Sequence, residues 1–253
     1  MKPVIHKTPY MKRIFILLIG LVAMVPAMSQ VEKNLVYDGN AEVRNHKGYT
    51  AIDVSSAIDL YISQGTEDAV AVSAGSDEIT ARIRTEMRGN TLRIYFDGKG
   101  LNWKNWGNHK MKAYVTFKEL NRIEASGACN VKVSGKIKQE RLLIEMSGAS
   151  DFKGDVEVSD LKLEASGASR ITVNGSVKML GINANGASDI RGYDINAENC
   201  KVDASGASVV RVTVNKELNA TASGASAIYY KGEGLIRDIN TSGGATVKRR
   251  SDD

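Results

Sequence analysis

The chain contains few of the residues on which several familiar sites and scaffolds depend. It has three His and two Cys among 253 residues, which excludes a His-rich metal site and a disulfide-built scaffold. Three Pro argue against a linker-rich, multidomain organisation. Aromatic residues make up 6% of the chain while Gly occurs 24 times, so the composition indicates many turns around small side chains.

The chain also has almost no excess of positive charge outside its first 29 residues. The formal net charge is +5, from 34 Lys and Arg against 29 Asp and Glu. Residues 1–29 hold Lys2, Lys7, Lys12 and Arg13 and no acidic residue. Without them, 30 basic and 29 acidic residues remain. The rest of the chain is therefore close to neutral, and no nucleic-acid partner is expected.

Residues 1–29 have the order of a secretory signal peptide. Lys12 and Arg13 precede an apolar run over residues 14–25, and small residues follow before Gln30. The run has 12 residues, whereas a helix needs about 20 to cross a bilayer. The first Cys is Cys129, so no lipid attachment atom lies near the predicted cleavage after Ser29. We predict an exported protein without a membrane span once the signal peptide is removed.

The remainder of the chain is a repeat built on a Ser-Gly-Ala-Ser motif. Seven related segments have their central glycines 21, 19, 19, 20, 18 and 19 residues apart, at Gly127, Gly148, Gly167, Gly186, Gly206, Gly224 and Gly243. A fixed period of about 20 residues is typical of solenoid proteins. We interpret these glycines as structural turn residues, because glycine gives the backbone the freedom that a tight corner needs.

The residues around each glycine alternate between apolar and polar. Four positions after the glycines lie Val131, Phe152, Ile171, Ile190, Val210, Ile228 and Val247, with polar or charged neighbours. Alternation on both sides of a corner predicts two short strands flanking every glycine. Strands joined by a repeating corner predict an all-β fold, a single-stranded right-handed parallel β-helix or β-solenoid, with 19–21 residues in most coils.

We expect one domain over residues 30–253. Residues 30–48 are polar and predict a lead-in or cap, residues 49–120 carry a decayed form of the repeat and predict irregular coils, and residues 121–247 carry the regular repeats. At about 19 residues per coil, this domain would contain about 11 coils. The charged segment 248–253 is expected to protect the last open edge.

In-register stacking would place like residues in rows along the solenoid. One row is acidic and comprises Glu124, Glu145, Glu164 and Asp203. It could form a Ca²⁺ site or an acid/base pair acting on polysaccharide, or simply a solvated face. A second row is basic and comprises Lys132, Lys153, Arg191, Arg211 and Lys248, interrupted by Thr172 and Tyr229. Without interleaved aromatic residues, we interpret the basic row as a solvated face as well.

Serine and cysteine offer no catalytic site in this pattern. A nucleophilic serine needs an adjacent base, and the histidines outside the signal peptide, His46 and His109, lie outside the regular repeats. Cys129 occupies a serine position of the repeat, whereas Cys200 occupies a core row about four coils away. That is roughly 15–20 Å at the strand spacing, too far for a disulfide. Both are predicted to be free thiols, buried or half-buried.

One segment breaks the repeat and holds both tryptophans. Trp103 and Trp106 lie in a glycine- and asparagine-rich stretch over residues 98–109. A loop with exposed tryptophans on a rigid scaffold could stack on a sugar or contact a partner surface. The same side chains could instead pin a hairpin to the solenoid. The two tryptophans are the candidate ligand contacts.

The succession of motifs resembles a known family. Residues 51–65, 92–96 and 115–128, followed by the Ser-Gly-Ala-Ser repeats, are similar to the "putative auto-transporter adhesin, head GIN domain" family, once a domain of unknown function and common in Bacteroidetes. The resemblance covers residues 49–230 and implies a right-handed β-helix and an exported protein. It supplies no catalytic residues. The chain shows no translocator barrel after its repeats, which argues against self-secretion.

These observations predict an exported, non-enzymatic β-helix protein that serves as a cell-surface adhesin or as a binding or scaffold module. The alternatives are a polysaccharide-active β-helix enzyme that uses the stacked carboxylates, and a purely structural envelope protein. No catalytic residue, cofactor or metal is assigned. The expected partner is a glycan or a cell-surface protein, and the expected location is the periplasm or cell surface of a Gram-negative bacterium.

Overall fold

The computed structural model describes residue 38 and residues 40–101 and 110–251, within one compact unit that runs from Val36 to Asp253. The predicted signal peptide, Trp103 and Trp106 lie outside the described residues. About 66% of the structure is strand and 3% is helix. The described residues contain no helix that is long and apolar enough to cross a membrane.

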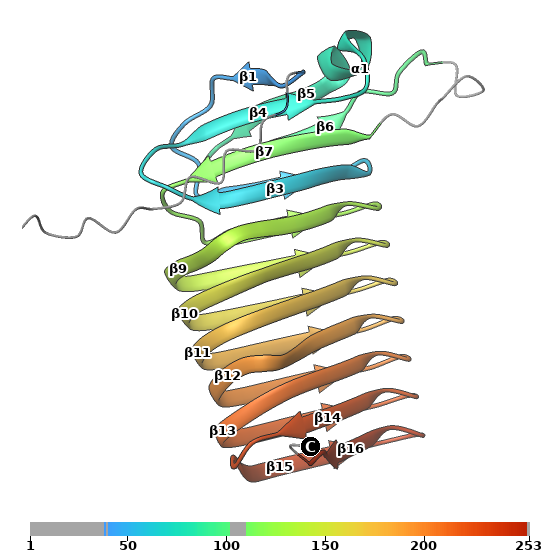
Figure 1. The fold of residues 1–253 in the computed structure, drawn as a ribbon. Coiled ribbons are helices and arrows are strands. Elements are labelled where there is room, and N and C mark those ends of the chain that lie inside the picture. The colour runs from blue at the N-terminus through green and yellow to red at the C-terminus, as the bar shows by residue number, and fades with distance from the viewer. Residues whose placement is uncertain (1–37, 39, 102–109, 252–253) are drawn as a thin grey trace, which may run out of the picture. The chain divides into compact units, whose positions relative to one another are not determined.

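Five long strands form the regular part of the fold (Figure 1). They are β9 (Asn130–Met146), β10 (Asp151–Ala165), β11 (Arg170–Ala184), β12 (Asp189–Ala204) and β13 (Val209–Ala222). Each pairs in parallel with the next, so that Leu161, for example, lies between Leu142 and Leu180. The parallel β-solenoid predicted from the repeat is confirmed. Each coil is one continuous curved strand between two corners, however, and not two short strands.

The repeated corners require glycine for two reasons. Gly167 has φ +68°, a left-handed conformation that other residues rarely adopt. A Cβ atom at this position would lie 2.6 Å from the carbonyl oxygen of Gly148 in the preceding coil. The next residue, Ala168, donates its backbone N–H to the same oxygen at 2.8 Å. The corners therefore stack through backbone contacts that leave no room for a side chain.

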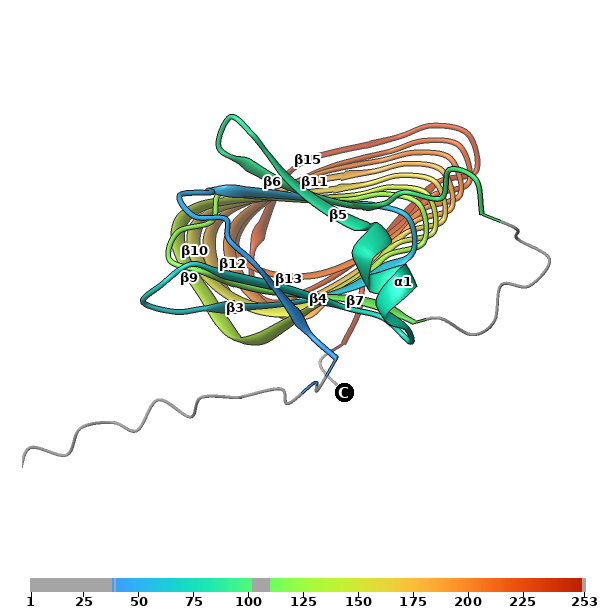
Figure 2. The same cartoon turned by 90° about the horizontal axis from the view of Figure 1, so that it is seen from above.

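The coils have two walls, seen as opposite sides of a flattened ring in Figure 2. The first wall begins with β1 (Glu42–Arg44), β4 (Ala69–Ser73), β7 (Met111–Phe117) and β3 (Ile58–Gln64) and continues through the first halves of β9–β13. The second wall begins with β5 (Ile83–Arg88), β6 (Thr91–Phe96), β2 (Ala51–Val54) and β8 (Arg122–Ala125) and continues through the second halves.

At the far end of the stack, each wall ends in short strands. The first wall ends with β14 (Ala227–Lys231) and β16 (Thr246–Arg249). The second wall ends with β15 (Leu235–Thr241), which pairs with the second half of β13. The solenoid contains about seven stacked parallel turns. The expectation of about 11 coils is therefore wrong, because much of the chain before residue 120 forms other structure.

That other structure is antiparallel. Strand β4 runs antiparallel to β7 and to β1, and β5 runs antiparallel to β6. A short helix, α1 (Asp77–Arg82), joins β4 to β5 and begins at Ser76, whose side chain accepts the backbone N–H of Ile79. Residues 49–120 thus include two reversals of chain direction in addition to coils, and these reversals lie at the first end of the stack (Figure 1).

The core consists of the inward positions that the alternation predicts. Val131, Phe152 and Ile171 stack on one another from successive coils and are fully or almost fully buried. Cys200 is buried between Leu180 and Leu218 on the second wall. Cys129 is also buried, and both cysteines are free, as predicted. Burial raises the pKa of both thiols, so they remain protonated in the folded protein.

Candidate ligand-binding face

The acidic row lies on the outer side of the second wall and is held by ion pairs. Glu124 and Glu145 are neighbours in register, and Arg122 contacts both, at 2.7 Å and 2.5 Å. Lys162 pairs with Glu164 at 2.5 Å. Lys201 lies 3.9 Å from Asp203. The register places Asn183 between Glu164 and Asp203, so the carboxylate row is interrupted.

The acidic row lines a shallow groove, and its carboxylates form ion pairs with neighbouring Lys or Arg side chains. Its lining includes Glu124, Glu145, Glu164 and Ser147. Burial raises the pKa of Glu124, and the neighbouring carboxylates of Asp53 and Glu145 raise it further, while Arg122 opposes them. Among the residues that the structure describes, no three acidic, His or Cys side chains are placed to hold a metal ion. The arrangement is that of an ion-pair ladder on an open wall.

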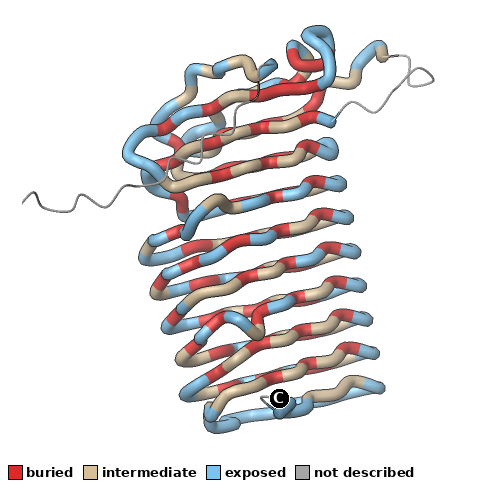
Figure 3. Tube along the Cα trace, viewed as in Figure 1, coloured by how far each residue is buried: buried red, intermediate tan, exposed pale blue. Residues whose placement is uncertain are grey.

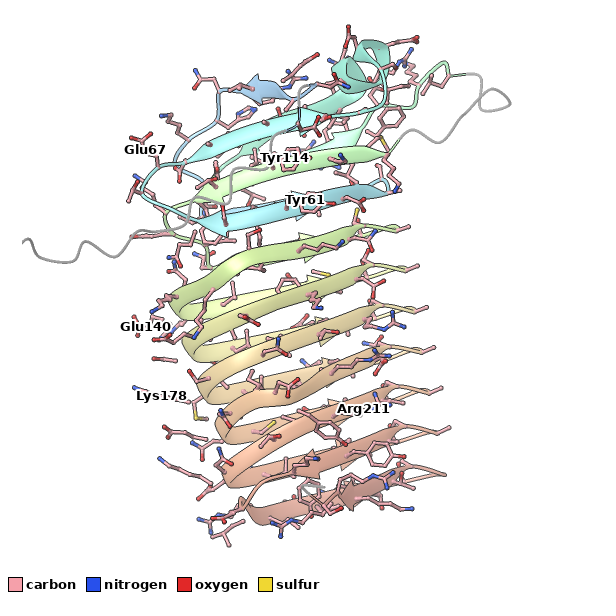
Figure 4. All side chains as sticks on the ribbon, viewed as in Figure 1. Tyr61, Glu67, Tyr114, Glu140, Lys178 and Arg211 are labelled. Atoms are coloured by element: carbon pink, nitrogen blue, oxygen red, sulfur yellow. The ribbon has the colours of Figure 1, made fainter. Side chains whose placement is uncertain are left out.

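The basic row lies on the outer side of the first wall. In the structure, further residues continue the row beyond Lys132. Register joins Lys132 to Tyr61 of β3, and Tyr61 to Tyr114 of β7. We call this set the basic–aromatic row; in spatial order it comprises Tyr114, Tyr61, Lys132, Lys153, Thr172, Arg191, Arg211, Tyr229 and Lys248. Tyr114, Tyr61 and Arg211 are seen on one face in Figure 4.

Two tyrosines that the sequence spacing did not assign to this row therefore continue it beyond Lys132. Tyr61 and Tyr114 stack on each other with ring centroids 5.4 Å apart, and the ammonium of Lys132 lies 5.8 Å from the Tyr61 ring. Both tyrosines belong to strands in which the glycine repeat is not visible, and β4, α1, β5 and β6 separate them in sequence. Sequence spacing alone could not place them beside the lysines.

Irregular coil lengths create two depressions along this row. Between β9 and β10 the register jumps from Lys132 opposite Lys153 to Lys136 opposite Asp155, so β9 bulges outward. Between β12 and β13 it jumps from Gly192 opposite Val212 to Asn196 opposite Thr213. These bulges lie in the coils whose glycines are 21 and 20 residues apart. The extra residues thus shape the surface of the first wall and leave the core rows intact.

The first depression is rich in lysine. It is lined by Lys132, Lys136, Lys153, Asp155 and Asn174, together with Val133 and two glycines. Asn174 donates a side-chain hydrogen bond to Asp155 at 2.8 Å, and Lys136 lies 3.4 Å from Glu157. Within the described ranges, Lys132 and Lys153 form no ion pair with a carboxylate. Their charges are therefore available to an anion from solution.

The second depression combines arginine with tyrosine. It is lined by Thr172, Arg191, Tyr193, Asp194 and Arg211, and the bulge in β12 supplies Tyr193 and Asp194. The ammonium of Lys231 lies 5.3 Å from the Tyr193 ring, and the guanidinium of Arg250 lies 4.4 Å from the Tyr229 ring. Partial burial raises the pKa of Tyr193, and the positive charge of Arg211 opposes that effect.

One carboxylate lies among the arginines of this depression. Asp189 is 2.8 Å from Arg191, 2.5 Å from Arg211 and 3.6 Å from Arg170. Arg170 also pairs with Asp151 at 3.3 Å, and Asp194 lies in the lining, whereas Arg191 and Arg211 share Asp189 as their carboxylate partner. Guanidinium groups bind carboxylate, sulfate and phosphate in a bidentate manner, and tyrosine rings provide flat apolar surface beside them. The depression is suited to a ligand that carries both a negative charge and a flat face.

The fold and this face define a class of protein: a parallel β-solenoid with an open wall of basic and aromatic side chains. The chain belongs to the family described as "Putative auto-transporter adhesin, head GIN domain", whose model matches residues 48–234. The resemblance noted in the sequence is thereby confirmed. No curated protein matches the chain in sequence.

Solved structures share the fold. A putative adhesin from Bacteroides fragilis NCTC 9343 is similar with a TM-score of 0.76 and 21% identity, covering 83% of this chain and 96% of its own. A putative lipid binding protein from Parabacteroides distasonis ATCC 8503 gives 0.64 and 20%, covering 85% and 98%. A putative adhesin from Parabacteroides merdae ATCC 43184 gives 0.60 and 18%, covering 85% and 98%. At these identities the likeness concerns the fold.

Proposed function

We propose that the protein is an exported, non-enzymatic binding module that acts as an adhesin and holds an anionic glycan on its first wall. The observation that carries this proposal is the basic–aromatic row with its two depressions. The row combines Lys132 and Lys153, which form no ion pair among the described residues, with two arginines that share the single carboxylate of Asp189, and with tyrosine rings. Acidic polysaccharides present carboxylate or sulfate groups beside flat sugar rings, and both features find partners here.

The spacing of the row also suits an extended polymer. Neighbouring strands lie about 4.8 Å apart, so the six steps from Lys132 to Lys248 span about 29 Å along the solenoid axis. Cations occur in pairs, Lys132 with Lys153 and Arg191 with Arg211, with Thr172 between the pairs. A polymer running along the axis would meet charge at intervals instead of at every coil.

Family membership and the N-terminal signal both favour an exported location. The family is named for adhesins, and residues 1–29 have the order of a secretory signal peptide. We place the protein in the periplasm or on the cell surface of a Gram-negative bacterium. Trp103 and Trp106 remain candidate contacts to the same glycan or to a cell-surface protein.

A polymer-retention assay tests the binding proposal. The full chain is passed over immobilised polygalacturonate, dextran sulfate and neutral dextran. We expect retention on the two anionic polymers, with elution by salt, and none on neutral dextran. The double variant Arg191→Gln/Arg211→Gln should lose most of this retention, and Trp103→Ala/Trp106→Ala should weaken it.

The matched control removes the same charge from the other wall. Lys162 and Lys201 are exposed and pair with Glu164 and Asp203. Lys162→Gln/Lys201→Gln should leave retention unchanged. Equal losses from both double variants would show that net charge alone is responsible and would refute the first wall as the site. Equal retention on neutral dextran would refute the anionic class of ligand.

A further inference from the structure

The last coil of the second wall is open to solvent. All seven residues of β15 are exposed (Figure 3), whereas the corresponding halves of earlier coils alternate between buried and exposed. Leu235 is 66% exposed, Ile236 is 49% exposed and Ile239 is 37% exposed. These three are most of the large apolar side chains that are exposed in the described part of the chain. An apolar edge of this kind is a liability for an isolated monomer.

The register explains why these residues are apolar. Ile236 continues the row of Leu218, and Ile239 continues the row of Ala220, both of which are buried. Ile236 and Ile239 are therefore inward-facing core positions over which no further coil is stacked within residues 110–251. In the same range, β15 pairs only with β13, so backbone groups on its other side are free to pair with another strand.

Strand β15 is self-complementary because of one irregularity. Its register with β13 skips Arg237, so Ile236 and Ile239 both face inward although they are three residues apart. Counted outward from the Arg237–Asp238 bond in either direction, the side chains face the same way in the same order: outward, then inward at Ile236 or Ile239, then outward again. In an antiparallel pair centred there, Ile236 would lie opposite Ile239 of a second copy. Arg237 would lie opposite Asp238 of that copy, and the pair would occur twice.

We propose that β15 is the docking edge for a second copy of this chain, joined through an antiparallel β15–β15 pair about a twofold axis. Such an interface is isologous, as in most homodimers, and it buries the inward isoleucines of both copies. Arg237 already pairs with Glu217 of its own chain at 2.5 Å, and the dimer would place Asp238 of the other copy opposite it as a second acidic partner. Only in this register do inward side chains lie opposite inward ones and Arg237 opposite Asp238. A pairing shifted by one residue would lose both matches.

The neighbouring edge strand differs in character, which confines the contact to β15. Strand β16 and the residue after it carry Lys248, Arg249 and Arg250. Arg249 occupies an inward position next to Tyr230 and donates to the carbonyl oxygen of Gly232 at 2.6 Å. Charged residues on an edge strand oppose pairing with another chain. The expectation that charge protects the last edge therefore applies to the first wall, while the second wall stays open.

Disulfide trapping in the full chain tests the register. In the proposed pair, residue 235 lies opposite residue 240 of the other copy, and both positions face outward. Within one chain these positions are about 16 Å apart along the strand, so a disulfide between them must join two copies. Leu235→Cys/Asn240→Cys should form a covalent dimer under mild oxidation. The shifted control Glu233→Cys/Asn240→Cys, which leaves Arg237 and Asp238 in place, should form markedly less, and equal trapping in both would overturn the register.

Sedimentation of the full chain over a concentration series tests the surface. We expect Ile236→Asp/Ile239→Asp to weaken dimerisation by about tenfold or more. Val43→Asp, at an 81% exposed position of β1, should not change it. Arg237→Asp and Asp238→Arg should each weaken the dimer, and the combined exchange should restore it. A strictly monomeric parent, or a dimer unaffected by the isoleucine changes, contradicts the proposal; circular dichroism confirms that each variant is folded.

Discussion

The stacked corners make a quantitative prediction about glycine. Gly167 and Gly135 both have positive φ, +68° and +76°. They differ in their surroundings, because a Cβ at Gly135 would meet nothing within 4 Å, whereas one at Gly167 would lie 2.6 Å from the Gly148 carbonyl oxygen. Replacing each by alanine therefore separates the cost of the backbone conformation from the cost of the contact between coils.

The magnitudes follow from these two effects. A left-handed alanine costs about 1–2 kcal/mol, and the reduced freedom of the unfolded chain offsets about 0.4–1 kcal/mol of that. Gly135→Ala should thus reduce the free energy of unfolding by about 1 kcal/mol. Gly167→Ala must also displace the corner and weaken the hydrogen bond from Ala168 to Gly148, so we expect a total of about 3 kcal/mol.

Urea unfolding followed by circular dichroism measures both variants against the parent protein. The predicted result is a midpoint that falls clearly further for Gly167→Ala than for Gly135→Ala. Similar shifts would mean that the corners of adjacent coils do not approach closely enough to exclude a Cβ atom. A Gly148→Ala variant, whose Cβ would lie 2.6 Å from the Gly127 carbonyl oxygen, should behave as Gly167→Ala does.

Three further predictions concern the cysteines, the surface carboxylates and the acidic row. Cys129→Ser places a hydroxyl in a row of buried serines, of which Ser169, Ser208 and Ser226 donate to backbone carbonyls, and the Cys129 thiol itself donates to the Ser126 carbonyl, so the change in the free energy of unfolding should be less than about 0.5 kcal/mol. Cys200→Ser buries a hydroxyl between two leucines and should cost about 1–3 kcal/mol, as measured by urea unfolding. Lysine or arginine partners lower the pKa of Glu157, Glu198 and Glu217. The contribution of these ion pairs to stability is therefore present above pH 4.5 and is lost as the pH falls through the lowered pKa values. Thermal unfolding over a pH series should show this loss, and the loss should be smaller in Glu157→Gln. Glu145→Gln should leave polygalacturonate retention unchanged, and incubation of the parent protein with polygalacturonate should release no unsaturated oligosaccharides; release that this variant abolishes would favour the enzyme hypothesis.

The regular coils could be predicted from the sequence because one repeat encodes both the turn and the core. Every central glycine fixes a corner, and the alternation around it fixes which side chains face inward, as Phe152 and Ile171 do. Cys200 could be assigned to the core for the same reason, since it replaces leucine in a row of leucines. Local patterns suffice where each coil contacts only its neighbours.

The first end of the stack and the ligand-binding face could not be predicted in this way. Strand β4 alternates as any strand does, and alternation does not distinguish parallel from antiparallel pairing, while β5 shows no regular alternation. Tyr61 and Tyr114 join the basic row only through long-range register. The one local signal was the uneven spacing of the glycines, since the longest gaps mark the bulges that form the two depressions.

Titration calorimetry with oligogalacturonides of increasing length measures whether the first wall holds an extended anionic glycan. Affinity should rise with length until the oligosaccharide spans the roughly 29 Å between Lys132 and Lys248, and then level off. Arg191→Gln/Arg211→Gln should lower affinity for the long oligosaccharides far more than for the shortest. An affinity independent of length, or one unchanged in this variant, would rule out binding along the first wall.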